Sequence, residues 1–446
     1  MRFIATTFFL GLLSILLPIN SAAQNADSLF SSGHAFYENA QYEQAANKFR
    51  ASGQLYLQQK DSVNWAWSLY RYGDAVMSAG NVREGLDALL SIDEHKPQQA
   101  PIDLKAYIKN YIGWAYRQLE QYDNSKKYYL HAIELADMSD DSVLIGRLNN
   151  NISYPYLYSG DYERAFTYQK KAKEIYESTG EDYRLSFVLN GMFLTFRELG
   201  LHVQANKYLR QSLAIREKVG NPNLLDVTYH NMAASFNALG QPDSAIIYYR
   251  KSLELSRMLQ NPYDITQTLI NIGQLYERSG DYDNALAYYN EALETNYQTD
   301  RPVSIANNLM RLAEVAIQNN DLGNAESFYQ EALNWLEQAK APQKLAGLYL
   351  NIAELKLKQG LYSEAKKYVA DAKNISREHF ISQRYRTYTV LAEIHKAEGK
   401  LDESLGQYRR AYDLFSNRGI SSKIEPTMNL ARAYHMVHSD SALILA

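Results

Sequence analysis

The sequence predicts an all-α protein, a solenoid of paired helices that repeats about every forty residues. Three observations support this: small residues recur at a fixed period, apolar residues follow helical spacing, and helix stop signals fall at one point of each copy. The clearest copy contains residues 271–292, with the sequence NIGQLYERSGDYDNALAYYNEA. Self-similarity at this period is typical of solenoids, so it decides the fold before any local motif does.

The small residues indicate where helices cross. With Gly273 as the reference, steps of forty, and of thirty-nine for the last two, reach eleven positions, ten of them small. These reference positions are Gly33, Gly73, Gly113, Ser153, Phe193, Ala233, Gly273, Ala313, Ala353, Ala392 and Ala431. Twelve residues further on, every copy from Ala45 to Ser404 is small; nineteen further on, nine of ten are Ala or Ser, with Ile92 the exception. Only small side chains let two helices approach this closely, so we expect the crossings here.

Each copy is predicted to hold two antiparallel helices. In the clearest copy the i, i+3, i+4 apolar spacing covers Thr266–Ser279 and Asp283–Thr295. Gly280 ends the first helix, and Asp281 stands where an N-cap carboxylate opens the second. One pair cannot bury its own apolar face, so neighbouring pairs must stack. Aromatic residues three after the reference are expected to fill the space between units: Phe36, Tyr116, Tyr156, Phe196, Phe236, Tyr276 and Tyr434.

The pattern resembles the tetratricopeptide repeat family. The residues that carry the resemblance are Gly273, Tyr276, Gly280, Asp281, Tyr282, Ala285, Tyr289 and Ala292, at that family's signature offsets. The resemblance covers roughly residues 26–446 and implies a right-handed α-α superhelix of about ten full helix pairs plus one incomplete pair. The repeats fall at about 26–60, 64–95, 103–138, 142–178, 182–219, 223–259, 263–298, 302–339, 343–379, 382–418 and 424–446. A forty-residue period exceeds the usual thirty-four and implies longer helices. Copies two and five depart most from the pattern, through Val76, Val82 and Phe193.

Residues 1–23 are predicted to be a signal peptide, outside the solenoid of residues 24–446. Arg2 precedes the apolar run Phe3–Leu17, Pro18 ends the run, and Ser21-Ala22-Ala23 offers small residues for cleavage. The alternative is an uncleaved anchor, but the run is shorter than the roughly 20 residues of a spanning helix. The sequence thus predicts an exported protein with no membrane span after cleavage.

The amino-acid composition indicates the cellular compartment of the protein and the class of molecule it binds. The chain has 0 cysteines, which for an exported protein favours a bacterial periplasm or exterior. Its formal net charge is -4 and no basic stripe is present, which argues against nucleic acid as a partner.

A ligand-binding face is predicted on the first helix of each copy, opposite the packed face. It holds the residues six before, two before, one after and five after the reference, and we expect it to line the concave side. An asparagine ladder stands two before the reference: Asn151, Asn231, Asn271, Asn351 and Asn429. Such amides can pair with the main chain of an extended peptide, but they can equally bridge neighbouring helices. Both interpretations are open, and Gly191 and Arg311 interrupt the ladder.

The same face differs between the two halves of the chain. Copies two to five carry the aromatic residues Trp67, Tyr107, Tyr111, Trp114, Tyr154, Tyr158 and Phe187. These side chains are either binding hot spots or buried between units. Copies eight to ten carry Glu314, Glu354 and Glu393 with Arg311, Lys358 and Arg386 nearby, either a solvated row or an attraction for a basic ligand. Arg147 and Arg278 complete the candidate peptide-binding residues.

No catalytic chemistry stands out. The sequence has no phosphate-binding Gly-rich loop, no Gly-x-Ser-x-Gly elbow and no His-Glu-x-x-His pair, and its 9 histidines are scattered. We therefore predict a non-enzymatic scaffold, with no cofactor and no metal, that binds a protein or peptide in the groove of its superhelix.

Two alternatives remain. Signal-peptide-bearing arrays of forty-residue repeats resemble those preceding a CHAT peptidase-like or histidine kinase domain, which implies a regulatory or sensing arm of a larger protein. Copy eleven (424–446) is incomplete, so the native chain is expected to continue past Ala446. The exposed last helix could instead support self-association, which would make the protein a self-assembling structural element.

Overall fold

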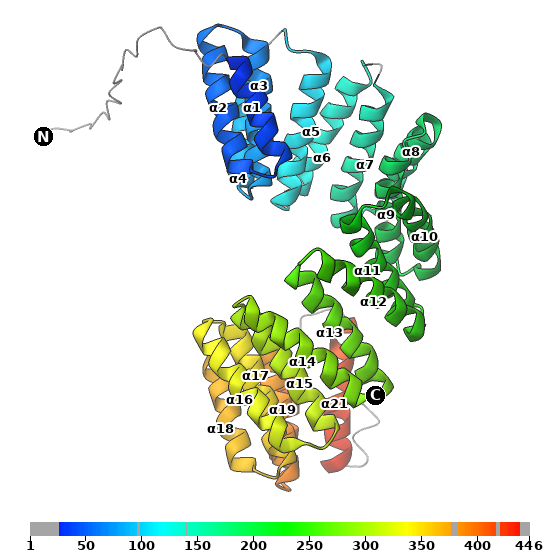
Figure 1. The fold of residues 1–446 in the computed structure, drawn as a ribbon. Helices are drawn as coiled ribbons and strands as arrows, with labels where there is room; N and C mark the ends of the chain where they lie inside the picture. Colours follow the sequence, from blue (N-terminus) through cyan, green and yellow to red (C-terminus); the bar gives the residue numbers. More distant parts are fainter. Residues whose placement is uncertain (1–25, 96–98, 140, 376–380, 416–419, 438–446) are drawn as a thin grey trace, which may run out of the picture. The chain divides into compact units, whose positions relative to one another are not determined.

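The computed structural model describes residues 26–95, 99–139, 141–375, 381–415 and 420–437. The predicted signal peptide and the last residues of copy eleven lie outside these ranges. Within them the chain forms α-helices and turns, with no strand, as the repeat pattern predicts (Figure 1).

The helices alternate between first and second members of a pair. The first helices are α1 (Ala26–Glu38), α3 (Ser62–Ser78), α5 (Ile102–Gln118), α7 (Ser142–Tyr158), α9 (Asp182–Glu198), α11 (Pro222–Ala238), α13 (Pro262–Ser279), α15 (Pro302–Gln318), α17 (Pro342–Lys358), α19 (Ile381–Ala397) and α21 (Ile420–Val437). The second helices are α2 (Tyr42–Gln58), α4 (Val82–His95), α6 (Tyr122–Ala136), α8 (Tyr162–Thr179), α10 (His202–Val219), α12 (Pro242–Met258), α14 (Tyr282–Gln298), α16 (Leu322–Gln338), α18 (Tyr362–Ile375) and α20 (Leu401–Asp413). The chain divides into two compact units: unit 1 ends at Val219 and contains α1–α10, and unit 2 begins at Gly220 and contains α11–α21. No change of composition in the sequence marks this division.

The predicted crossing points are confirmed. From Ala45 to Ser404, the small residues twelve after the reference are all buried, and so are those nineteen after it. A Cβ atom added at Gly273 would lie 2.6 Å from Cε1 of Tyr289, which is fully buried on the second helix of the same pair. At the crossing, the backbone of the first helix therefore lies in direct contact with an aromatic ring of the second helix.

The turn between the paired helices also follows the prediction. Gly280 adopts a left-handed conformation with φ of 80°, and the Asp281 carboxylate accepts a hydrogen bond from the Asn284 N–H. Both helices of this copy are longer than the apolar spacing indicates. Asn261 caps α13 and Pro262 begins it, adding a first turn whose side chains contribute little to the apolar stripe.

The aromatic residues three after the reference mostly pack within a pair, not between units as predicted. Tyr276 stacks on Tyr288 at 5.6 Å between ring centroids, and Tyr156 stacks on Tyr168 at 5.5 Å. Antiparallel crossing brings the residue three after the reference opposite the residue fifteen after it. The prediction was wrong because it treated the first helix alone.

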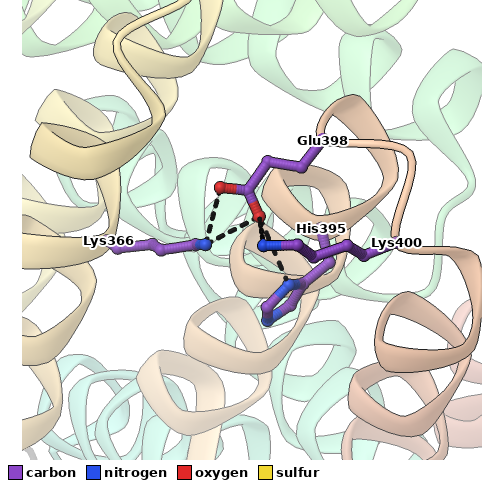
Figure 2. A network of polar contacts seen from close by, with 4 residues as sticks. All are labelled: Lys366, His395, Glu398 and Lys400. Atoms are coloured by element: carbon purple, nitrogen blue, oxygen red, sulfur yellow. Dashed lines mark hydrogen bonds and ion pairs between the residues drawn. The ribbon is translucent and has the colours of Figure 1, made fainter.

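Outside the apolar core, ion pairs connect one helix pair to the next. In unit 2 the Glu398 carboxylate accepts two hydrogen bonds of 2.7 Å from Lys366 of α18 and one of 3.1 Å from Lys400 (Figure 2). His395 lies 3.7 Å from the same carboxylate. The lysines hold the pKa of Glu398 below its usual value, which indicates that this carboxylate stays ionised where copies nine and ten meet.

Candidate peptide-binding face

The first helices line the inner side of unit 1. Helix α5 contacts both α3 and α7, and α7 contacts α9, whereas successive second helices make no comparable contacts in the described part of the unit. A stack of pairs in which one set of helices is closer together must curve toward that set. The first helices of unit 1 therefore form its concave side, and α17 and α19 approach each other in the same way in unit 2.

A cavity of about 630 Å³ opens on this concave side of unit 1. The side chains around it come from four successive first helices and from Tyr176 of α8. They are Asp74, Met77, Ser78, Asn110, Tyr111, Trp114, Arg117, Arg147, Asn150, Asn151, Tyr154, Tyr176, Tyr183, Arg184 and Phe187. Its volume lies in the range of small-molecule and peptide side-chain pockets.

Two arginines of the cavity wall lie against tyrosine rings. The Arg117 guanidinium lies 5.2 Å from the centroid of the Tyr154 ring, and that of Arg147 lies 5.5 Å from the Tyr107 ring. These are cation–π distances, which orient the guanidinium groups without neutralising their charge. Burial raises the pKa of the Tyr154 hydroxyl, so the ring stays neutral and serves as an apolar wall with a hydroxyl at its edge.

The one carboxylate in the wall is already paired. Asp74 accepts a hydrogen bond of 3.1 Å from the Tyr37 hydroxyl and one of 3.2 Å from the Arg71 guanidinium. Burial raises the pKa of Asp74, and the Arg71 charge offsets part of this effect. In contrast, neither Arg117 nor Arg147 forms an ion pair with a carboxylate in the described part of the chain. The cavity therefore carries uncompensated positive charge.

Amides complete the cavity. Asn151 Nδ2 donates a hydrogen bond of 2.9 Å to Asn110 Oδ1, which joins α7 to α5. The Asn150 Oδ1 atom and the Arg117 Nε atom are buried without a hydrogen-bond partner among the described residues. A buried polar atom without a partner is uncommon and marks a position where a ligand atom or water can bond.

The structure brings six of the residues predicted on this face to the cavity and leaves three aromatics outside. Tyr111, Trp114, Arg147, Asn151, Tyr154 and Phe187 line it, whereas the exposed Tyr158 does not. Trp67 and Tyr107 instead pack on Tyr70, with ring centroids 5.8 and 6.4 Å apart, and are partly buried against the core of copies two and three.

Several cavity residues were missed from the sequence. Asn110 and Asn150 stand three before the reference, and Arg117 stands four after it, outside the four positions used for the prediction. A wider arc of the helical wheel would have included them. Tyr176 comes from a second helix, and no feature of the first-helix pattern points to it.

In unit 2 the asparagine ladder bonds to neighbouring first helices. Asn271 Nδ2 lies 3.3 Å from His230 Nε2, and Asn351 Oδ1 accepts a bond of 2.9 Å from Arg386. Asn429 Nδ2 donates a bond of 3.0 Å to the Tyr385 hydroxyl. Asn231 is half-buried on α11. These bonds use part of each amide's capacity, since an amide has two donor hydrogens and an acceptor oxygen.

The predicted glutamate row in unit 2 is partly neutralised within the chain. Glu354 pairs with Arg386 at 2.8 Å, and Glu393 pairs with Lys396 at 3.3 Å. Glu314 stays in contact with solvent, but desolvation by the surrounding side chains raises the pKa of its carboxylate, and Arg311 offsets part of that rise.

The remaining predicted basic residues differ in their surroundings. Arg278 donates a bond of 3.1 Å to Asn237 Oδ1, so it bridges α13 and α11. Arg311 lines a second, smaller cavity of about 360 Å³ in unit 2, together with Tyr263 and Glu314. Lys358 is exposed at the end of α17.

Neither a cluster of metal-ligating side chains nor a membrane-spanning helix is found among the described residues. No group of three or more His, Cys, Asp and Glu side chains in these ranges is arranged to hold a metal ion. None of the described helices has the length and apolar character needed to cross a membrane.

Comparison with known families agrees with the repeat geometry. The model of the tetratricopeptide repeat family matches residues 104–178, 144–218 and 224–297; the first two matches overlap by one copy, and the third starts two copies after the second. Residues 104–218 and 224–297 therefore match the tetratricopeptide repeat. A search of curated proteins gave no match.

Several solved structures share the fold. The apo form of RapI matches with a TM-score of 0.57 and 14% identity, over 78% of this chain and 97% of RapI. The apo form of the quorum sensor NprR from B. thuringiensis gives 0.57 and 16%, over 87% of this chain and 98% of NprR. A signal transduction ATPase with numerous domains and a tetratricopeptide repeat sensor, from Pyrococcus horikoshii, gives 0.58 and 14%, over 85% of this chain and 55% of the ATPase. At these identities the likeness concerns the fold alone.

Proposed function

We propose that this protein is a non-enzymatic tetratricopeptide-repeat scaffold that binds an extended peptide segment of another protein on the concave face of unit 1. The observation that carries the proposal is the cavity on α3, α5, α7 and α9, where the concave faces of four successive first helices present half-buried rings, guanidinium groups and amides together. Aromatic and arginine side chains in a partly desolvated pocket are the usual composition of a binding hot spot.

The dimensions of the cavity favour a peptide. Neighbouring helix axes lie roughly 10 Å apart, so a path across four first helices is roughly 30 Å long. An extended chain advances about 3.3 Å per residue, so about nine residues would cross it. Amides such as Asn150 and Asn151 can bond the main chain of such a segment whatever its sequence.

We further propose that the protein is exported from a bacterial cell. This rests on the signal-peptide pattern of residues 1–23 and on the absence of cysteine from the whole sequence.

A library of random dodecapeptides displayed on phage, selected on the intact chain, tests the binding proposal. Enriched peptides should bind Trp114→Ala at least about thirty-fold more weakly, because loss of a central tryptophan at a hot spot commonly costs about 2 kcal/mol or more.

The matched control is Leu130→Ala, which removes a 37% exposed side chain from the second helix α6 and should leave affinity unchanged. Circular dichroism verifies that both variants keep their helical content. Binding that Trp114→Ala leaves unaltered, or no enriched peptide at all, would remove the proposal.

A further inference from the structure

The charge of the unit 1 cavity bears on the chemical class of the peptide that would bind there. Three arginines line it: Arg117, Arg147 and Arg184. Arg184 donates a hydrogen bond of 3.1 Å to the neighbouring Glu181, so its charge is partly compensated. The Asp74 carboxylate is held by Tyr37 and Arg71, as described above. Arg117 and Arg147 thus remain as guanidinium groups without a carboxylate partner in the described part of the chain.

The rings around these arginines lower the local dielectric. Cation–π contact with Tyr154 and Tyr107 fixes the guanidinium planes, and Trp114 lies on the helix that carries Arg117. Charges in such surroundings interact more strongly with a partner than charges in open water. A planar guanidinium offers paired N–H donors that match a carboxylate. Arg117 Nε is buried and has no hydrogen-bond partner among the described residues, so this donor is unsatisfied in the absence of a ligand.

On this basis, and resting on the proposed function, we infer that the occupant of the unit 1 cavity is an acidic peptide segment. An internal aspartate or glutamate side chain would bond Arg117 and Arg147, and an adjacent aromatic or aliphatic residue would pack on Trp114 and Tyr154.

The position of the arginines favours an internal side chain over the free carboxylate of a chain end. Arg117 is on α5 and Arg147 on α7, the two middle helices of the four. Cavity residues continue past them in both directions, to Asp74 and Ser78 on α3 and to Tyr183 and Phe187 on α9. A segment that uses the whole cavity therefore extends on both sides of the arginine pair.

The same display library tests this inference when each dodecapeptide is fused through its C-terminus, so that no free terminal carboxylate is present. Peptides enriched on the intact chain should contain Asp or Glu next to an aromatic or aliphatic residue. Their affinity should fall at least about tenfold for Arg117→Gln and for Arg147→Gln, because each variant removes hydrogen bonds between a guanidinium group and a carboxylate. Replacing the acidic residue of the peptide by its amide should reduce affinity by a similar factor.

The control is Arg83→Gln, which removes an exposed arginine from the second helix α4 and should change nothing. Arg117→Lys and Arg147→Lys keep the charge and should retain part of the affinity. Peptides that depend on Trp114 but show no acidic enrichment, or that bind both glutamine variants unchanged, would overturn the acidic assignment and leave the proposed function standing. If no peptide depends on Trp114, the proposed function itself fails.

Discussion

Replacing Ala285 by leucine should destabilise the α13–α14 pair by about 3 kcal/mol, at the upper end of the cost of overpacking a core. Ala285 is completely buried where α14 crosses α13, at a position that is small in all ten copies that have it. Three additional carbon atoms have no space there, because Gly273 on α13 already lies against the Tyr289 ring. The helices must separate, and the contacts of this pair with its neighbours are lost with them.

The measurement is hydrogen exchange of the α13 and α14 amides, with thermal unfolding of the whole chain beside it. Ala287→Leu is the matched control, because Ala287 is exposed on the same helix two residues away. We expect that variant to stay within about 0.5 kcal/mol of the parent. Equal protection in the two leucine variants would show that the crossing does not hold the pair together.

Asp226→Ala should cost about 2–4 kcal/mol, because it leaves two buried hydroxyl groups without their acceptor. The Asp226 carboxylate on α11 is 3% exposed and accepts hydrogen bonds of 2.5 Å from Ser252 and 2.7 Å from Ser256 on α12. Ser252 stands at the nineteenth position after the reference, where copies one and five also use a serine hydroxyl to bond the start of the first helix.

Urea denaturation followed by circular dichroism gives the loss for Asp226→Ala. Asp226→Asn keeps one acceptor oxygen and should recover part of the stability. Glu254→Ala removes an exposed carboxylate from the same second helix and serves as the control. If Asp226→Ala unfolds at the same urea concentration as Glu254→Ala, the buried hydrogen bonds contribute nothing measurable.

The fold can be predicted well from the sequence because the same packing pattern recurs in ten copies of the repeat. The small residue at Ala285 and the turn at Gly280-Asp281 each serve one local purpose, and each recurs at a fixed spacing. Such positions can be found from the sequence because steric exclusion and backbone conformation act over a few residues. The stacking of Tyr276 on Tyr288 was placed wrongly, since it depends on how the two helices cross and not on either helix alone.

The candidate site is harder to predict from the sequence than the fold. Periodicity selects the face on which the unit 1 cavity lies, and with it Trp114, Asn151 and Tyr154. It does not separate Trp67, which packs on Tyr70, from Trp114, which lines the cavity, since both are tryptophans on the same face. That difference, like the pairing of Asp74 and the free charge of Arg117, arises from contacts between helices about forty residues apart.

Photocrosslinking locates the bound peptide on the protein surface. A peptide enriched on the intact chain, carrying one benzophenone side chain, is irradiated with the protein, and the adducts are mapped by mass spectrometry. We expect adducts on the first helices of unit 1, at residues such as Tyr111, Trp114, Tyr154 and Phe187. Adducts confined to the second helices, or spread evenly over the chain, would contradict the proposed function.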